Sequence, residues 1–307
     1  MRTDEVKTIS TCQSDGMGKE QAVGQAKEPH SPEKVTVSAY LAQHYALPDE
    51  LPPLPLPDEP FVKLWREADG ADALAFLADA FGLSSLDFPW QAMDAIHIRF
   101  AVTLAGRLPV VTTASHADFS FMEALVNGRD KASAYPPTVN AFTIEARAKA
   151  IYRHRVILLN RAPYSNVPAE VVGLADDDWL RRSQALRTRH ECVHYETLRI
   201  FGKMKNHALD EIAADAMGQI AAFGNFDADR QRPFFGLKCG EGTCTGRLSF
   251  YCQNVKEEER PQVYRAVDEV LDAVAADIRE QTAKGVPEIE ILQSLLGQSI
   301  TRKGETL

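Results

Sequence analysis

The sequence predicts an α+β protein in which helices dominate and a small number of strands form a sheet. Arg155–Asn160 (RVILLN) is a short run of branched apolar residues, the pattern of a buried strand. Trp179–Phe201 and His207–Phe223 follow it and carry apolar residues at helical spacing. Two further amphipathic segments, Pro261–Lys284 and Pro287–Ile300, are expected to form helices that pack on the body.

The amino-acid composition limits which classes of protein and of binding partner fit the sequence. The 307 residues are 45% hydrophobic, enough for a sizeable core in one large or two small domains. The formal net charge of −9 argues against nucleic acid as a partner, because phosphate binding needs clustered Lys and Arg. We expect no membrane partner, since no apolar run approaches the roughly 18 residues of a membrane span. The start of the sequence lacks the apolar core of a secretory signal. The odd number of cysteines, 5, is not typical of a disulfide framework. We therefore expect a cytoplasmic protein.

The N-terminal part is expected to be mainly helical and contains no chemical motif. Residues 1–33 are polar and lack hydrophobic periodicity, which predicts a disordered tail. The proline-rich run Pro48–Pro60 predicts an extended polyproline II strap lying along the domain, with a PxxP ligand as the alternative. The other expected elements are helices around Val35–Tyr45, over Phe61–Phe81 with an end at Gly82, and over Pro89–Leu104, and a strand at Val110–Thr113.

The central helices have recognisable ends. Asp176–Asp178 is an acidic start for the first of them, and Gly202 closes it. Asn206 can cap the second, which stops at Gly224.

The first central helix carries the motif HECVH. His190 and His194 are four residues apart, so they project from one face and can approach one metal ion. Glu191 lies beside them, where it can reach a metal-bound water as a general base. The histidines belong to an apolar stripe that also contains Leu186, Val193, Thr197 and Phe201, so they face the interior. Two buried imidazoles need partners, and a metal would supply one for both.

The second central helix adds two carboxylates. Glu211 and Asp215 are four apart on one face, which Gly218 and Ala222 continue. Carboxylates at this spacing repel, and small residues imply close approach of another helix. A Zn²⁺ ion with the two histidines would explain both features, with Glu211 as the third ligand and Asp215 accepting a hydrogen bond from a histidine to fix its tautomer. The alternative is that both carboxylates pair with Lys or Arg of a neighbouring element.

HExxH followed on the next helix by ExxAD resembles the gluzincin clan of zinc metallopeptidases, the thermolysin-like and related enzymes. The resemblance covers about residues 180–223. It implies zinc bound by His190, His194 and Glu211, a catalytic base at Glu191, and a supporting aspartate at Asp215. It also implies a zincin-like core and a peptide or protein substrate.

Other features depart from this pattern or leave alternatives open. The 17 positions from His194 to Glu211 are fewer than in thermolysin-like enzymes. His207 is another possible third ligand, or could act in catalysis by stabilising the tetrahedral intermediate, a role for which Tyr195 and Tyr164 compete. The metzincin pattern is absent, since Thr197 and Ile200 stand where it needs glycine and histidine. Cys239, Cys244 and Cys252 lack CxxC pairs and are interpreted as buried or loosely grouped thiols, with a second metal site as the alternative. Cys192 is interpreted as a small buried side chain.

The expected organisation follows from these assignments. Residues 1–33 form the tail, 34–130 a mixed, mainly helical region, 131–250 the zincin-like metal-binding domain, and 251–307 the C-terminal helices. In the clan, the strand at Arg155–Asn160 corresponds to the edge strand that pairs with an extended substrate. The expected function is zinc-dependent hydrolysis of a peptide or amide bond. The alternatives are a non-catalytic zincin-like module with structural zinc that binds a partner, and a metal-free helical scaffold.

Overall fold

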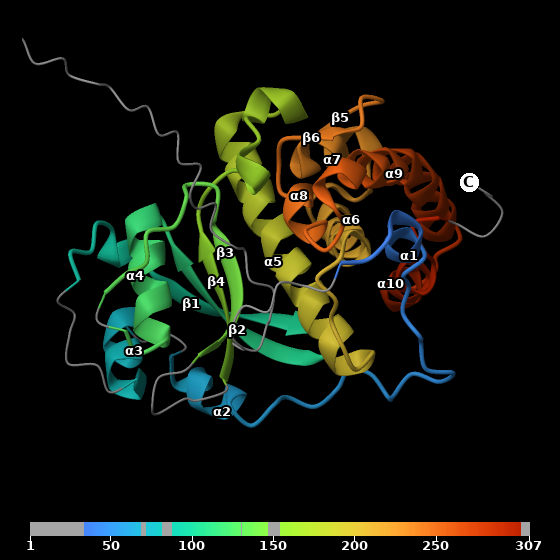
Figure 1. Ribbon diagram of the computed structural model, residues 1–307. Helices are drawn as coiled ribbons and strands as arrows, with labels where there is room; N and C mark the ends of the chain where they lie inside the picture. Colours follow the sequence, from blue (N-terminus) through green and yellow to red (C-terminus); the bar gives the residue numbers. More distant parts are fainter. Residues whose placement is uncertain (1–33, 69–71, 82–87, 130, 147–153, 302–307) are drawn as a thin grey trace, which may run out of the picture.

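A computed structural model describes residues 34–68, 72–81, 88–129, 131–146 and 154–301 of the chain (Figure 1). The fold mixes α and β structure, as predicted. A sheet lies on one side of the long helix α5 (Asp176–Ile200), and α6 (Ala208–Phe223) lies on the other. The helices α9 (Arg260–Ala283) and α10 (Glu288–Gly297) continue the helical side and match the predicted C-terminal pair. The predicted tail, 1–33, lies outside the described residues.

Within the described residues, the main sheet has 4 strands in the order β1-β2-β4-β3. Their bounds are β1 His97–Thr103, β2 Gly106–Thr113, β3 Ala141–Ala146 and β4 His154–Asn160. The β2–β4 pair is parallel, and the β1–β2 and β3–β4 pairs are antiparallel. The prediction that Arg155–Asn160 is an edge strand is therefore wrong, because β4 is paired on both sides. Its continuous apolar run is the pattern of a central strand, and β3 takes the edge instead.

The helix predicted over Pro89–Leu104 is also wrong. A single short turn, Met93–Ala95, is followed by β1, which pairs with β2 from His97↔Thr112 to Thr103↔Gly106. Branched and aromatic residues in HIRFAVT favour a strand once a partner is present. The predicted strand at Val110–Thr113 is confirmed within β2. Because β2 pairs with β4, the boundary predicted between residues 130 and 131 divides strands of one sheet.

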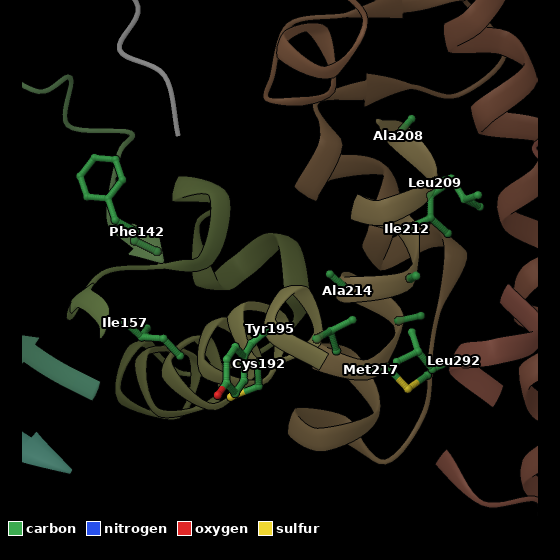
Figure 2. Close-up of a cluster of buried hydrophobic side chains, with 14 of the residues drawn as sticks. Phe142, Ile157, Cys192, Tyr195, Ala208, Leu209, Ile212, Ala214, Met217 and Leu292 are labelled. Carbon is green, nitrogen blue, oxygen red and sulfur yellow. The ribbon is translucent and has the colours of Figure 1, made fainter. Parts of the chain in front are cut away.

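The core joins the sheet to both central helices (Figure 2). Ile157 of the sheet lies on one side of α5, and Met217 of α6 and Leu292 of α10 lie on the other. The helices α5 and α6 approach closely where the sequence has small residues: a Cβ at position 218 would lie 2.8 Å from the carbonyl oxygen of Leu186. The close helix contact inferred from Gly218 is therefore confirmed, and it fixes how the two motif-bearing helices face each other.

The proline-rich segment lies along the domain as a strap. The backbone N–H of Leu56 donates to Leu104, and Arg107 pairs with Asp58. Before the strap, α1 (Val37–Leu41) is shorter than predicted. The segment predicted as one helix over Phe61–Phe81 contains α2 (Val62–Trp65), a turn at Arg66–Ala68 and α3 (Ala73–Phe81).

The remaining elements are α4 (His116–Val126), α7 (Ala228–Phe235), α8 (Leu248–Tyr251) and the short β5 (Leu237–Lys238) and β6 (Thr243–Cys244) hairpin, with further single turns at Tyr164–Asn166, Ala169–Val172 and Glu257–Glu259. Helix α4 lies on the face of the sheet opposite α5, where the ring of Phe119 stacks on Phe142. None of the described helices has both the length and the apolar character of a membrane span.

Candidate metal centre

Helices α5 and α6 bring His190, His194 and Glu211 together. The three residues are 5%, 4% and 1% exposed, and the candidate ligand atoms all lie within 4.8 Å of one another. The two Nε2 atoms are 3.0 Å apart. Glu211 Oε2 lies 3.5 Å from His190 Nε2, and Glu211 Oε1 lies 3.4 Å from His194 Nε2. The three residues therefore form a small triangle inside the protein.

The triangle fits a tetrahedral zinc ion. With zinc–ligand distances of about 2.0–2.1 Å, tetrahedral angles place neighbouring ligand atoms about 3.3–3.4 Å apart. The two Nε2 atoms are 3.0 Å apart, and each lies 3.4 or 3.5 Å from one of the two carboxylate oxygens of Glu211, which is close to this value. Two imidazoles and one carboxylate are also a common set of protein ligands for catalytic zinc, which keeps a further position for water.

Asp215 supports the triangle from behind. Its Oδ1 lies 2.7 Å from His190 Nδ1 and also accepts a hydrogen bond from the Tyr164 hydroxyl. Its Oδ2 accepts from Gln231 and from Arg247. Burial opposes ionisation of Asp215, but the charge of Arg247 and the hydrogen bond from His190 hold its pKa below the ordinary value. An ionised Asp215 keeps the proton of His190 on Nδ1 and leaves Nε2 free to bind a cation.

Arg247 is a component of the site that the sequence analysis missed. Its Nη1 donates to Glu211 Oε2 at 2.6 Å, and its other terminal nitrogen donates to Asp215. The guanidinium also lies over the ring of Tyr164, 5.3 Å from the centroid. The alternative that these carboxylates pair with a basic residue is thus realised in part, since Glu211 contacts both Arg247 and the histidines.

Glu191 lies beside the triangle and faces the sheet. Its Oε2 accepts a hydrogen bond of 2.5 Å from Thr143 on β3. With His190 and Arg247 it lines a cavity of about 20 Å³, room for about one water molecule. Ser165 lines the same cavity, has a left-handed φ of 50°, and its buried hydroxyl has no partner among the described residues. A water in this cavity would satisfy that hydroxyl and lie next to Glu191.

The attraction between Glu211 and the histidines shifts the pKa values of His194 and Glu211. Burial alone would lower the pKa of His194, but the hydrogen bond and charge of Glu211 raise it to about 9. Burial would raise the pKa of Glu211, but the hydrogen bond from His194 and the charges of His190 and Arg247 lower it to about 2. Without an ion, a protonated His194 can therefore pair with Glu211, which is how the metal-free alternative would satisfy these groups.

The expectation for His207 needs correction. His207 is the N-cap of α6: its Nδ1 accepts from the Leu209 backbone N–H at 3.1 Å. Its Nε2 lies 3.0 Å from the Tyr40 carbonyl oxygen, to which it donates. Because both ring nitrogens are engaged, His207 is available neither as a third ligand nor as a catalytic group. The cap predicted at Asn206 is wrong by one residue.

Capping by His207 predicts a pH-dependent stability. Burial lowers its pKa from 6.5 to about 4, so the folded protein favours the neutral ring. The stabilisation is therefore fully present above about pH 6.5 and is lost as the pH falls towards 4. His207→Asn keeps a capping acceptor that does not titrate, so its free energy of unfolding should fall less steeply across this window in denaturant titrations. Equal slopes for the two proteins would contradict the assignment, and zinc content should be the same in both.

The two tyrosines considered for catalysis lie in different places. The Tyr195 hydroxyl donates to Glu59 of the strap at 2.8 Å, so it points away from the triangle. The Tyr164 hydroxyl lies 3.0 Å from His190 Nδ1, on the side of the ring that faces Asp215. Tyr164 therefore supports the orientation of His190 and does not face the candidate metal position.

The described cysteines are free thiols, and none joins a group of metal-binding side chains within the described part of the chain. Cys244 donates to the Phe235 carbonyl oxygen, and Cys252 lies next to the Tyr40 hydroxyl. Cys192 is buried in the core and Cys239 is exposed. The buried position predicted for Cys192 is confirmed.

Comparison with known proteins identifies a family, but the description of this family names no activity. No curated protein and no solved structure matches the chain. A family of unknown function (DUF7005) matches residues 137–298, more than half of the chain, and this range contains the whole triangle, Asp215 and Arg247. The chain belongs to this family of unknown function, DUF7005.

Proposed function

We propose that this protein is a zinc-dependent hydrolase that cleaves a peptide or another amide bond. The observation that carries the proposal is the triangle of His190, His194 and Glu211 at tetrahedral spacing, with Glu191 beside it on a cavity of one-water size. An HExxH helix followed by a glutamate ligand on the next helix resembles the gluzincin pattern, although the two are closer in sequence than in thermolysin-like enzymes. We also propose that the compartment is the cytoplasm.

Each residue of the site has a defined task in such a reaction. Zinc, when bound, lowers the pKa of a water towards about 7 and polarises the substrate carbonyl. Glu191 takes the proton of the attacking water and later delivers it to the leaving amine. Thr143 orients Glu191 through their hydrogen bond. Asp215 and Tyr164 hold His190 in position, and Arg247 holds Glu211.

The sheet supports a zincin-like core. Strand β3 lies at the sheet edge and is antiparallel to β4. Its Thr143 reaches the candidate catalytic base directly. An extended substrate that pairs with the open edge of β3 would therefore bring a carbonyl group close to Glu191.

One observation favours the second candidate, a structural zinc site. The cavity at the triangle measures only about 20 Å³, and Thr138 and Ser165 are among the residues that line it. A peptide does not fit into this volume, so a hydrolase would have to move the segments that carry these residues. A structural ion would need no such movement.

Metal analysis and a cleavage assay test the proposal together. We expect the purified protein to contain one equivalent of zinc and to cleave members of a library of quenched fluorescent peptides. A chelator should stop cleavage and added zinc should restore it. Full zinc content without cleavage of any peptide or amide substrate would favour the structural site, and absence of zinc binding would refute both.

A further inference from the structure

A second concave surface lies between the β1 edge of the sheet and α5. It consists of two adjoining hollows of about 510 and 220 Å³, which share Arg99, Thr112, Arg181 and Gln184. Helix α5 contributes Arg181, Thr188 and Cys192, which project from the side of the helix opposite His190, because successive residues are about 100° apart. This groove, called the β1 groove below, is thus separate from the candidate metal centre.

The β1 groove is positively charged in a protein of net charge −9. Its described lining contains Arg99, Arg161, Arg181 and Arg189 but no aspartate or glutamate. Arg181 pairs with Asp178 of the same helix, and Arg189 pairs with the buried Glu196 and with Glu288. No described carboxylate pairs with Arg99 or Arg161. The groove therefore presents at least two guanidinium groups that are available to an anionic ligand.

The same groove runs along an open sheet edge. Among the described residues, β1 forms ladder bonds only with β2. Its sequence, HIRFAVT, has high strand propensity and contains neither proline nor lysine, the residues that commonly protect an edge. Val102 is 84% exposed on this strand. An edge strand without proline and without a second partner strand among the described residues is able to pair with another extended segment.

We propose that the β1 edge binds an extended acidic peptide segment, which adds to the sheet as a further strand. Arg99 and its β2 partner Val110 point to one face of the sheet, and Phe100 and Val102, which also line the groove, point to the other. Side chains of the added strand that point the same way as Arg99 lie near Arg99 and the groove arginines, so acidic residues suit these positions. Side chains of the added strand that point to the other face lie near Phe100 and Val102, so apolar residues suit those positions.

The positive charge of the β1 groove argues against a second copy of the chain as the segment that pairs with β1. Pairing two β1 strands would bring two arginine-lined grooves together without adding a carboxylate from either lining. Like charges brought together across an interface oppose association. An acidic partner instead neutralises Arg99 and Arg161.

Fluorescence polarisation with labelled peptides tests the proposal. The probe is an octapeptide that alternates glutamate with valine. The comparison peptides are the same composition in scrambled order, and lysine in place of glutamate. We expect saturable, salt-sensitive binding of the alternating peptide alone. The measurement does not depend on hydrolysis, so its outcome is distinct from that of the zinc-hydrolase proposal.

Variants of the full chain locate the binding site. Arg99→Glu turns an attraction into a repulsion and should weaken binding of the alternating peptide about tenfold. Arg279→Glu makes the same charge change on the exposed side of α9 and should leave binding within about twofold. Equal effects of the two variants, or equal binding of the scrambled peptide, would overturn the proposal. A dimer that Arg99→Glu dissociates in sedimentation would overturn it too, because the edge would then be occupied by a second copy.

Discussion

Glu191→Gln should lower the turnover of a cleavable substrate by a factor of about 10² to 10⁴, the range expected for deletion of a general base. Glutamine keeps the size of the side chain and can still accept the hydrogen bond of Thr143. It cannot take a proton from water at neutral pH. Because Glu191 is not part of the ligand triangle, zinc content and the midpoint of thermal unfolding should remain close to those of the unchanged protein.

Thr143→Val provides a graded control for that result. It removes the hydrogen bond to Glu191 but leaves the carboxylate, so turnover should fall by less than in Glu191→Gln. Elemental analysis of both variants would establish that zinc is retained. Full turnover in Glu191→Gln would remove the general-base role and leave the structural-zinc alternative as the better account.

The local sequence pattern was sufficient to predict the two central helices of this fold. Helix α5 begins at Asp176, as its acidic start predicts, and α6 ends before Gly224, whose φ is +81°. Strand β4 was also predictable, because a central strand is buried on both faces and its middle, from Val156 to Leu159, is apolar. Its position in the sheet was not, since strand order depends on which distant segments pair with it. For the same reason β1 resembled a helix until its pairing with β2 was known.

In the candidate site, too, local sequence pattern predicts some residues, and others depend on contacts between distant segments. Helical spacing alone places His190 beside His194 and Glu211 beside Asp215. Arg247 follows Glu211 by 36 residues and precedes the short helix α8, where no periodicity marks it as buried. His207 illustrates the opposite error. A histidine next to a motif helix suggests a ligand, but its ring nitrogens cap α6 and bind Tyr40.

Removal of one ligand should separate the metal site from a metal-free network of hydrogen bonds. His194→Ala removes one ligand atom from the triangle, and Glu211→Gln replaces the charged carboxylate with a neutral amide, which is a much weaker zinc ligand. Loss of an outer partner of a metal ligand typically costs about 10- to 100-fold in affinity, so loss of a ligand itself should cost more. Glutamine is preferable to alanine at position 211, because it can still accept the hydrogen bond of the largely buried Arg247.

Added zinc should raise the unfolding temperature of the unchanged protein, because an ion that binds the folded state stabilises it by about 2.7 kcal/mol at a hundred times its Kd. At that zinc concentration the two ligand variants should show little or no increase. Asp210→Asn is the matched control: Asp210 is buried next to Glu211 but bonds to Tyr45 and lies outside the triangle, so the zinc effect should persist. A Glu211→Gln protein that still holds a full equivalent of zinc with unchanged affinity would contradict the ligand assignment. Since both nitrogens of His207 are engaged, Asp215 would then be the first alternative ligand to replace.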